Sequence, residues 1–240
     1  MSSSAAAHEP IPAARSTRRA GRPRLPLLIA CAAVLPAAVL TGCSSGAAKP
    51  AAAPSATPKA SAVPKVRYAT LPDPCRALSA GTVKSLVPGV KSTKGTEAAA
   101  GEQKERGGCS WNGLSGYQYR FLDTAFQRYD NVTGGAGGDD QATSAYTTAV
   151  RTTEAGATSA AGQPKTAVLS GVGDEASLVT WTVTKDHDLY YNATVVTRSA
   201  NAVLTVDYVG AGLQGDHKPS ASDLSSGVEK AAKQALAALG

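Results

Sequence analysis

The sequence predicts one α+β domain at residues 68–240, with an antiparallel sheet whose helices pack on one face. Every Trp, Tyr and Phe lies at or after Tyr68, which confines the core to the last 173 residues. Three consecutive segments alternate apolar and polar side chains and are joined by short turns, as in an antiparallel meander. Helical periodicity occurs before, between and after the strands, and helices on one face of a sheet bury these segments economically.

The first helix is expected over about 74–87, with Ser79 as a point where it can break. Asp73 and Pro74 form an N-cap followed by a proline at the first helical position. Pro88 and Gly89 then end the helix.

The middle of the domain predicts a loop, a strand and a second helix. Residues 91–107 are polar and glycine-rich, which favours a loop, and the alternation at 117–121 favours a strand. The glycine-rich run 134–138 breaks the chain, and we assign no role to it. Asp139 or Asp140 then caps a helix that continues to about 153. Its apolar face is formed by Ala142, Tyr146, Ala149 and Val150.

The last third predicts the meander and a final helix. Alternation at 179–183, 189–195 and 204–208 predicts three strands, separated by turns at 185–188 and 199–201. Ser222 is expected to cap the final helix. The apolar residues of this helix, at helical spacing, are Leu224, Val228, Ala231, Ala235, Leu236 and Leu239.

Residues 1–42 have the pattern of a bacterial lipoprotein signal peptide. Arg15 to Arg24 include five arginines, and an apolar run of 16 residues from Leu25 to Leu40 follows. A membrane-spanning helix needs about 20 apolar residues, so this run is typical of a signal peptide. The run ends in Leu40-Thr41-Gly42-Cys43, the form of a lipobox, which predicts a diacylglycerol group on Cys43. The alternative is an ordinary secretory signal cleaved near Ala38, with Cys43 incidental.

Residues 43–67 are expected to be the lipidated cysteine and a disordered tether. Eight Ala, four Pro, four Ser and three Lys occupy 19 of the 22 positions from 44 to 65. Such a segment has nothing to bury and cannot form a core. It is expected to hold the domain away from the membrane.

The basic isoelectric point does not indicate a nucleic-acid binder. Residues 1–43 carry five Arg and one acid, and the tether adds Lys49, Lys59 and Lys65. The remaining chain has 16 basic and 17 acidic residues. Because the part with a core is nearly neutral, we expect no nucleic-acid partner.

The four cysteines fall in different parts of this predicted organisation. Cys31 lies in the apolar run and Cys43 in the lipobox, which leaves Cys75 and Cys109 in the exported domain. An oxidising compartment favours a disulfide between them. The alternative, a metal site with two cysteines, lacks His partners at ligand spacing.

Three short motifs, behind a lipobox, resemble a known family. They are Asp73-Pro74-Cys75, Cys109-Ser110-Trp111 and the segment 171–176 (Gly-Val-Gly-Asp-Glu-Ala). This ordered set resembles the actinobacterial lipoprotein family catalogued as domain of unknown function 3558, over about residues 70–210. The resemblance implies a cell-envelope lipoprotein with an α+β domain and no established catalysis.

Three residues of these motifs are candidates for a ligand site or a turn. Trp111 is expected to pack beside the disulfide, with its ring over sulfur. Asp174 and Glu175 can cap a turn or bind a cation, and Gly171 and Gly173 permit backbone angles that other residues resist. We favour the structural role for all of these residues.

Recognisable catalytic and metal motifs are missing from the sequence. No Gly-x-Ser-x-Gly or His-Glu-x-x-His pattern occurs. Asp186-His187-Asp188 has metal-ligating residue types, but on a turn these side chains diverge. His217 stands alone beside Pro219. We therefore expect no catalytic residue, no bound metal and no cofactor.

The expected function is a lipid-anchored, non-catalytic binding domain on the outer face of the cell membrane. Its partners would be the membrane, through the lipid, and a small ligand or an envelope protein. The alternatives are an envelope hydrolase and a structural adaptor of a cell-wall or secretion complex. A groove with clustered carboxylates and His would favour the enzyme. An enclosed apolar cavity would favour a ligand-binding domain, and a flat apolar patch would favour the adaptor.

Overall fold

The computed structural model describes residues 65–98, 105–160 and 163–240. The chain divides into two units, Met1–Thr57 and Pro58–Gly240, and the described residues all belong to the second unit. The signal peptide and Cys43 therefore lie outside the described residues, as does most of the tether.

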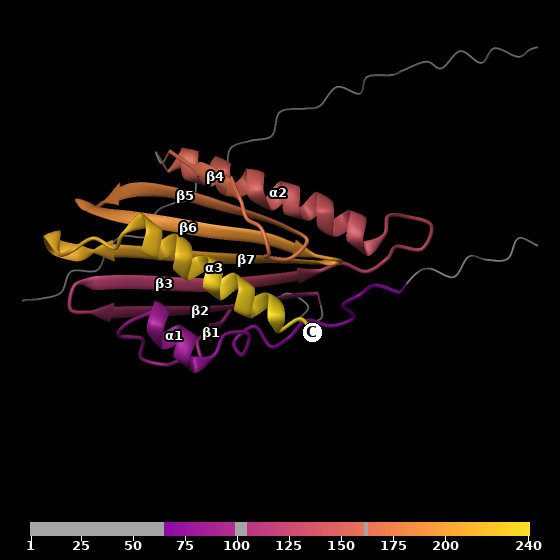
Figure 1. Cartoon of the computed structure of the whole chain (residues 1–240), viewed down its shortest axis with the longest axis horizontal. Coiled ribbons are helices and arrows are strands. Elements are labelled where there is room, and N and C mark those ends of the chain that lie inside the picture. The colour runs from indigo at the N-terminus through magenta and orange to yellow at the C-terminus, as the bar shows by residue number, and fades with distance from the viewer. Residues whose placement is uncertain (1–64, 99–104, 161–162) are drawn as a thin grey trace, which may run out of the picture. The chain divides into compact units, whose positions relative to one another are not determined.

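The described residues form one antiparallel sheet and three α-helices (Figure 1). The seven strands lie in the order β1-β2-β3-β7-β6-β5-β4, and every neighbouring pair is antiparallel. The strands are β1 (Thr96–Glu97), β2 (Arg106–Ser115), β3 (Gln118–Arg128), β4 (Lys165–Val168), β5 (Glu175–Lys185), β6 (Asp188–Ser199) and β7 (Ala202–Gly212). The helices are α1 (Ala80–Leu86), α2 (Gly138–Ser159) and α3 (Ala221–Ala237). The single α+β domain with an antiparallel sheet is thus confirmed.

The predicted meander is present as β5, β6 and β7. Each strand pairs with the next through a short turn, and β7 then pairs with β3 in the middle of the sheet. A fourth strand pair, the hairpin of β2 with β3, has ten register positions. This hairpin joins the N-terminal half of the domain to the meander.

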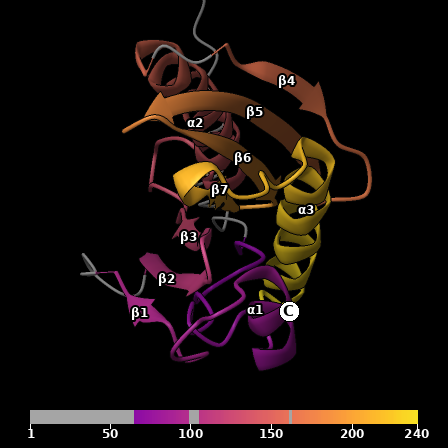
Figure 2. The same ribbon diagram turned by 90° about the vertical axis from the view of Figure 1, so that its left-hand side faces the viewer.

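The helices lie on both faces of the sheet, so the expectation of one covered face is wrong. Val195 of β6 packs in the main core with α3, whereas the adjacent Val196 packs with Ala142 of α2. Successive strand residues point to opposite faces. Figure 2 shows α2 on one side of the sheet and α3 on the other. The reason is that β6 and β7 carry buried apolar residues on both faces, so both faces need a cover.

The main core lies between the sheet and the helices α1 and α3. We call this side of the sheet the closed face. Leu122, Leu204 and Val206 of the sheet and Val228 of α3 are completely buried there. Tyr208 lies in the same layer, and its hydroxyl donates a hydrogen bond to the carbonyl oxygen of Leu86 in α1. This bond attaches the short helix to the sheet.

Two helix starts differ from the prediction. α1 begins only after Ser79, whose hydroxyl accepts a hydrogen bond from the amide of Thr82, so the helix is limited to the part after the expected break. The segment after Asp73 forms a turn instead, in which the Asp73 carboxylate accepts from the amide of Cys75. α3 begins after Ser220 and not after Ser222, because the Ser220 hydroxyl caps the amide of Asp223.

The expected face of α2 is confirmed, while its length and its cap differ. Ala142 and the half-buried Tyr146, Ala149 and Val150 form its small apolar cluster with the sheet. The helix starts after Gly137 without a side-chain cap and continues to Ser159. Its C-terminal end therefore lies about six residues beyond the end that the apolar pattern indicates.

The loop expected at 91–107 is wrong in part. The edge strand β1 lies within it, and β2 begins at Arg106. The glycines at 107 and 108 hide the alternating pattern that would indicate a strand. The strand forms because it pairs with β3, and the small size of glycine suits positions where other chain segments come close. A side chain at Gly108 would come within 3.1 Å of the Thr124 carbonyl oxygen.

The start of the folded domain is attached by Asn201, in the turn between β6 and β7. Its side chain is completely buried and bonds the amide and the carbonyl of Tyr68 at 2.9 Å each. It also donates to the carbonyl of Tyr129 at 2.8 Å. This one amide therefore joins the incoming chain to two strand ends, which agrees with a core that begins at Tyr68.

Candidate functional site

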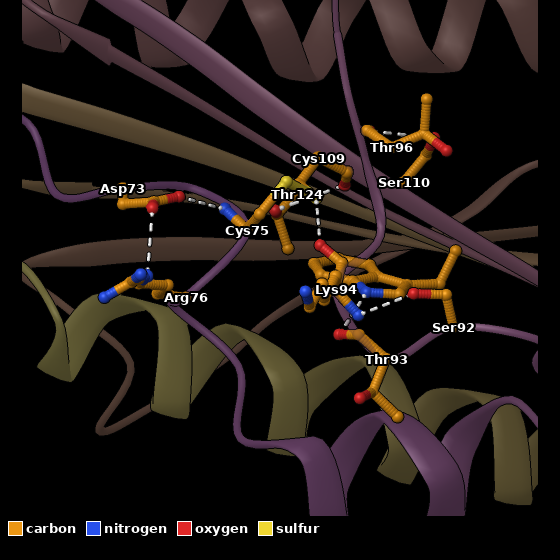
Figure 3. The surroundings of a disulfide bond; sticks show 11 residues. Asp73, Cys75, Arg76, Ser92, Thr93, Lys94, Thr96, Cys109, Ser110 and Thr124 are labelled. Carbon is orange, nitrogen blue, oxygen red and sulfur yellow. Dashed lines mark hydrogen bonds and ion pairs between the residues drawn. A yellow bond between two sulfur atoms is a disulfide. The ribbon is translucent and has the colours of Figure 1, made fainter.

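The disulfide between Cys75 and Cys109 is present, as expected (Figure 3). Cys109 is completely buried in the main core. Trp111 lies beside it, is 2% exposed, and donates from its indole nitrogen to the carbonyl of Thr93 at 3.1 Å. A side chain at Gly95 would meet both the sulfur and the indole ring. Trp111 is therefore packed and hydrogen-bonded inside the protein, which leaves no ring face for a ligand.

Asp174 and Glu175 lie where the chain enters β5, and both face Arg198 of β6. The Glu175 carboxylate is 2.9 Å from the Arg198 guanidinium. The Asp174 carboxylate accepts from the amide of Ala200 at 2.6 Å, in a turn where Ala200 has a positive φ of 45°. A side chain at Gly173 would come within 2.4 Å of the Arg198 carbonyl oxygen. Through these contacts the two acids hold the turn between β6 and β7 in place.

The other residues considered for chemistry lie on exposed turns. His187 occupies the turn between β5 and β6 with a φ of 69°. The side chain of His217 is fully exposed beside Asp216, whose pKa is lowered by hydrogen bonds from Gln118 and from the His217 amide. Within the described ranges, no group of three or more His, Cys, Asp or Glu side chains could hold a metal ion.

A trough of about 810 Å³ lies between α2 and the strands β2, β3 and β7, on the face opposite the main core. We call it the α2 trough. The helix contributes small and hydroxylated side chains, namely Ser144, Ala145, Thr148, Ala149, Thr152 and Thr153. The strands contribute Gly108, Ala125, Gln127, Val203 and Thr205. Because these side chains are short, the helix and the sheet do not close on each other here.

One end of the α2 trough is cationic. Arg106 is exposed and stands opposite Gln127 in the β2–β3 ladder. With the Gln127 amide oriented to satisfy both neighbours, its oxygen accepts from the Arg106 guanidinium at 3.1 Å and its nitrogen donates to the Tyr129 hydroxyl. Burial raises the pKa of Tyr129, and the charge of Arg106 opposes this shift. The Arg106 side chain therefore has a fixed neighbour and a solvent-facing charge.

Two aspartates lie on the same face, one step farther along the strands. Asp123 of β3 is the register partner of Asp207 of β7, and we call them the acid pair. Asp123 and Ala125 are two residues apart, so both side chains point to the trough side of the sheet. Side chains directly opposite in a ladder have Cβ atoms about 4.5–5.5 Å apart. The acid pair therefore lies on the trough side of the sheet, next to the lining residues Ala125 and Thr205 and just outside the lining itself.

The acid pair is electrostatically perturbed. Burial, followed by the charge of Asp207, raises the pKa of Asp123 to about 6. Burial also raises the pKa of Asp207, although a hydrogen bond from the Thr194 hydroxyl acts in the opposite direction. The register neighbours on either side are Ser110 and Thr194, which carry no charge. A cationic group placed at the pair would lower both pKa values and relieve the repulsion.

Sequence reasoning did not find the acid pair or Arg106. The available signal was an aspartate within each of two strand-like segments, at Asp123 and Asp207, since charged residues are rarely placed in half-buried strands without a reason. That these two meet depends on the β3–β7 pairing. This pairing brings Asp123 next to a residue 84 positions later in the chain and leaves no local pattern.

Comparison with known proteins adds no relative, because no protein-family model and no curated protein matches the chain. In the described part of the chain, no helix is both long and apolar enough to cross a bilayer.

Proposed function

We propose that the protein is a lipid-anchored extracytoplasmic binding protein that uses the α2 trough to hold a ligand without converting it. The observation that carries the proposal is the trough itself, with Arg106 in its lining and the acid pair just beyond its lining on the same face of the sheet. Its volume is within the roughly 300–1,000 Å³ of typical ligand sites. The lipobox, the tether and the Cys75–Cys109 disulfide support the location, because disulfides persist mainly outside the cytoplasm.

Binding without turnover agrees with the lining of the trough. The hydroxyls of Ser144 and Thr148 donate to carbonyl oxygens of their own helix, at 3.0 and 2.8 Å. A nucleophilic hydroxyl needs a base within hydrogen-bond reach, and among the described residues that line the trough none is His, Asp or Glu. The side chains are suited to contact and hydrogen bonding.

An envelope hydrolase is the second candidate, and the acid pair favours it. Two neighbouring carboxyls with raised pKa values can divide the roles of acid and base, as they do in glycoside hydrolysis. We place this candidate second because the Asp207 carboxylate accepts a hydrogen bond from the Thr194 hydroxyl. A carboxylate held in this way is poorly suited to transfer a proton to or from a substrate.

Native mass spectrometry of the full chain, purified in detergent from the cell envelope, tests the binding proposal. A small-molecule adduct is expected on the wild-type protein and on Thr184→Trp, an exposed strand position outside the trough. Ala125→Trp, which fills the floor, should lose the adduct. An adduct that Ala125→Trp retains would reject the trough as the site.

Turnover is measured on the same adduct. We expect the ligand to return with unchanged mass after long incubation, and His187→Asn and His217→Ala to retain it as the wild type does. A product of altered mass that disappears in Asp123→Asn would place the hydrolase first.

The location is tested separately. Cys43→Ala should remove the protein from the detergent phase or leave the precursor uncleaved, while Cys31→Ala should behave as the wild type. Unchanged partitioning of Cys43→Ala would reject the lipid anchor.

A further inference from the structure

Opposite charges lie on the trough side of the sheet, separated along the strands. Arg106, opposite Gln127, lines the trough, and Asp123 and Asp207 lie just beyond its lining. Asp123 is four positions before Gln127 in β3, which corresponds to about 13 Å. A ligand that meets both charged groups must therefore carry an anion and a cation at about this distance.

The floor between the two ends favours an extended and slender ligand. Gly108, Ala125 and Thr205 form one row across β2, β3 and β7, midway between the row of Arg106 and the row of the acid pair, so the floor between the two charges is low. About 13 Å is the length of four residues of extended polypeptide. An extended chain of this length therefore matches the spacing of the two charges.

The helix wall of the trough presents hydrogen-bond acceptors. The hydroxyls of Ser144, Thr148 and Thr153 each donate their hydrogen to a carbonyl of α2, at 3.0, 2.8 and 3.0 Å. A hydroxyl that has donated its hydrogen still has lone pairs to accept with. These oxygens are therefore complementary to a ligand with a row of N–H donors.

We infer that the α2 trough binds an extended peptide of about four residues with free termini, its carboxylate at Arg106 and its ammonium at the acid pair. This inference rests on the proposed function and specifies the ligand class of the same site. Guanidinium and carboxylate form the charge-assisted, bidentate contact that suits a peptide C-terminus. Two adjacent carboxylates offer several acceptor sites to the three hydrogens of an ammonium group.

Isothermal titration calorimetry of the full chain in detergent, at pH 7.5, tests the inference with tetraalanine. The probe is used with free termini, with an acetylated N-terminus and with an amidated C-terminus. Each blocked end should weaken binding at least about tenfold, because one charged contact is lost. Dialanine and hexaalanine with free termini should also bind at least about tenfold more weakly than tetraalanine, because neither can place its two ends at the two charges.

Two variants assign each end of the peptide. Arg106→Gln should weaken the free peptide and abolish the effect of amidation, while Asp123→Asn should reduce the effect of acetylation. Arg151→Gln and Asp186→Asn make the same charge changes at exposed positions outside the trough and should leave all three affinities unchanged.

Three results would overturn the inference. Equal affinities for free and blocked tetraalanine would remove the charged ends from recognition. An amidation effect that persists in Arg106→Gln would place the carboxylate elsewhere. If no form of tetraalanine binds while Ala125→Trp still loses the natural adduct, the peptide inference fails and the proposed function stands. If Ala125→Trp retains the natural adduct, the proposed function fails as well.

Discussion

The two faces of the sheet are built from the same strands and have different properties. On β7, Val206 points into the main core and is completely buried, while its neighbour Asp207 points to the trough side. On β3, Leu122 and Asp123 show the same contrast. Because alternate residues serve opposite faces, one strand can stabilise the fold with one set of side chains and form a site with the other.

The covering helices explain the difference between the faces. The closed face meets α3, which contributes Leu224 and Val228, and α1, which is attached by Tyr208. Among the described helices, α2 alone covers the trough face, and its buried contact is Ala142 with Val196 and Val203. A helix with small residues leaves room beside it, so the trough results from the composition of α2. Substitutions on the closed face should therefore change stability, and those on the trough face should change binding.

Loss of the disulfide should have the largest effect, because it attaches the N-terminal segment to the closed face. Changing Cys75 and Cys109 to Ala together should lower the free energy of unfolding by about 3–4 kcal/mol, the loop-closure value for a separation of 34 residues. Urea unfolding of the full chain in detergent measures this. Ser110→Ala, next to Cys109 on the other face, should change stability by less than about 0.5 kcal/mol. Equal losses for both changes would contradict the division between the faces.

Two valines of β7 give a matched comparison of the faces. Val206→Ala should cost about 2–3 kcal/mol, since two buried methyl groups are lost and a cavity remains. Val209→Ala, on the trough side and half-buried, should cost less than about 1 kcal/mol. The midpoints of urea unfolding give both values. Similar costs at the two positions would show that the trough side is packed as tightly as the core.

Enlarging two alanines tests the same contrast in the opposite direction. Ala193 is 1% exposed in the main core, and Ala193→Leu should destabilise the protein by about 1–3 kcal/mol through overpacking. Ala125 lies on the exposed floor of the trough, so Ala125→Leu should change stability by less than about 0.5 kcal/mol. Thermal unfolding compares the two variants. Destabilisation by Ala125→Leu as large as that by Ala193→Leu would indicate that the floor has no free space.

The sequence predicts the elements better than their arrangement. The meander and the apolar faces of α2 and α3 follow from local periodicity, and the cysteine pair follows from elimination. The strand β4 was missed because its four residues are all exposed and carry no burial pattern. The helix faces were misplaced because adjacent residues such as Val195 and Val196 are both apolar. Such a pair signals a strand buried on both sides, and it was available in the sequence.

The candidate residues show the same limit. Trp111, Asp174 and Glu175 stand in recognisable motifs, and the structure uses them to pack the disulfide and to hold a turn. Arg106, Asp123 and Asp207 stand in no motif and come together only through ladder register. Short motifs thus identify residues that stabilise turns and the disulfide. They do not identify the charged residues on the trough side, because those residues come together only through strand pairing.

The acid pair makes the smallest but most specific prediction, a fall in stability as pH rises. Burial and the charge of Asp207 raise the pKa of Asp123 from 3.8 to about 6. Between these two values the folded protein holds a proton that the unfolded chain releases, so the free energy of unfolding decreases as pH rises from about 4 to about 6 and is level above. The raised pKa of Asp207 contributes with the same sign. Asp123→Asn should therefore flatten this decrease and stabilise the protein at pH 7.5 by about 1 kcal/mol, a value reduced for partial solvent exposure.

Urea unfolding at several pH values between 4 and 8 measures this effect, with Asp186→Asn as a control that removes one carboxylate from an exposed turn. The wild type and the control should share the decrease, and Asp123→Asn should lack most of it. The same substitution removes a contact for a ligand ammonium, so it should stabilise the protein and weaken tetraalanine binding together. A side chain that served only the fold would not change stability and affinity in opposite directions. A loss of stability in Asp123→Asn at pH 7.5 would show that the ionised pair supports the sheet, and the trough face would then contribute to the fold as the closed face does.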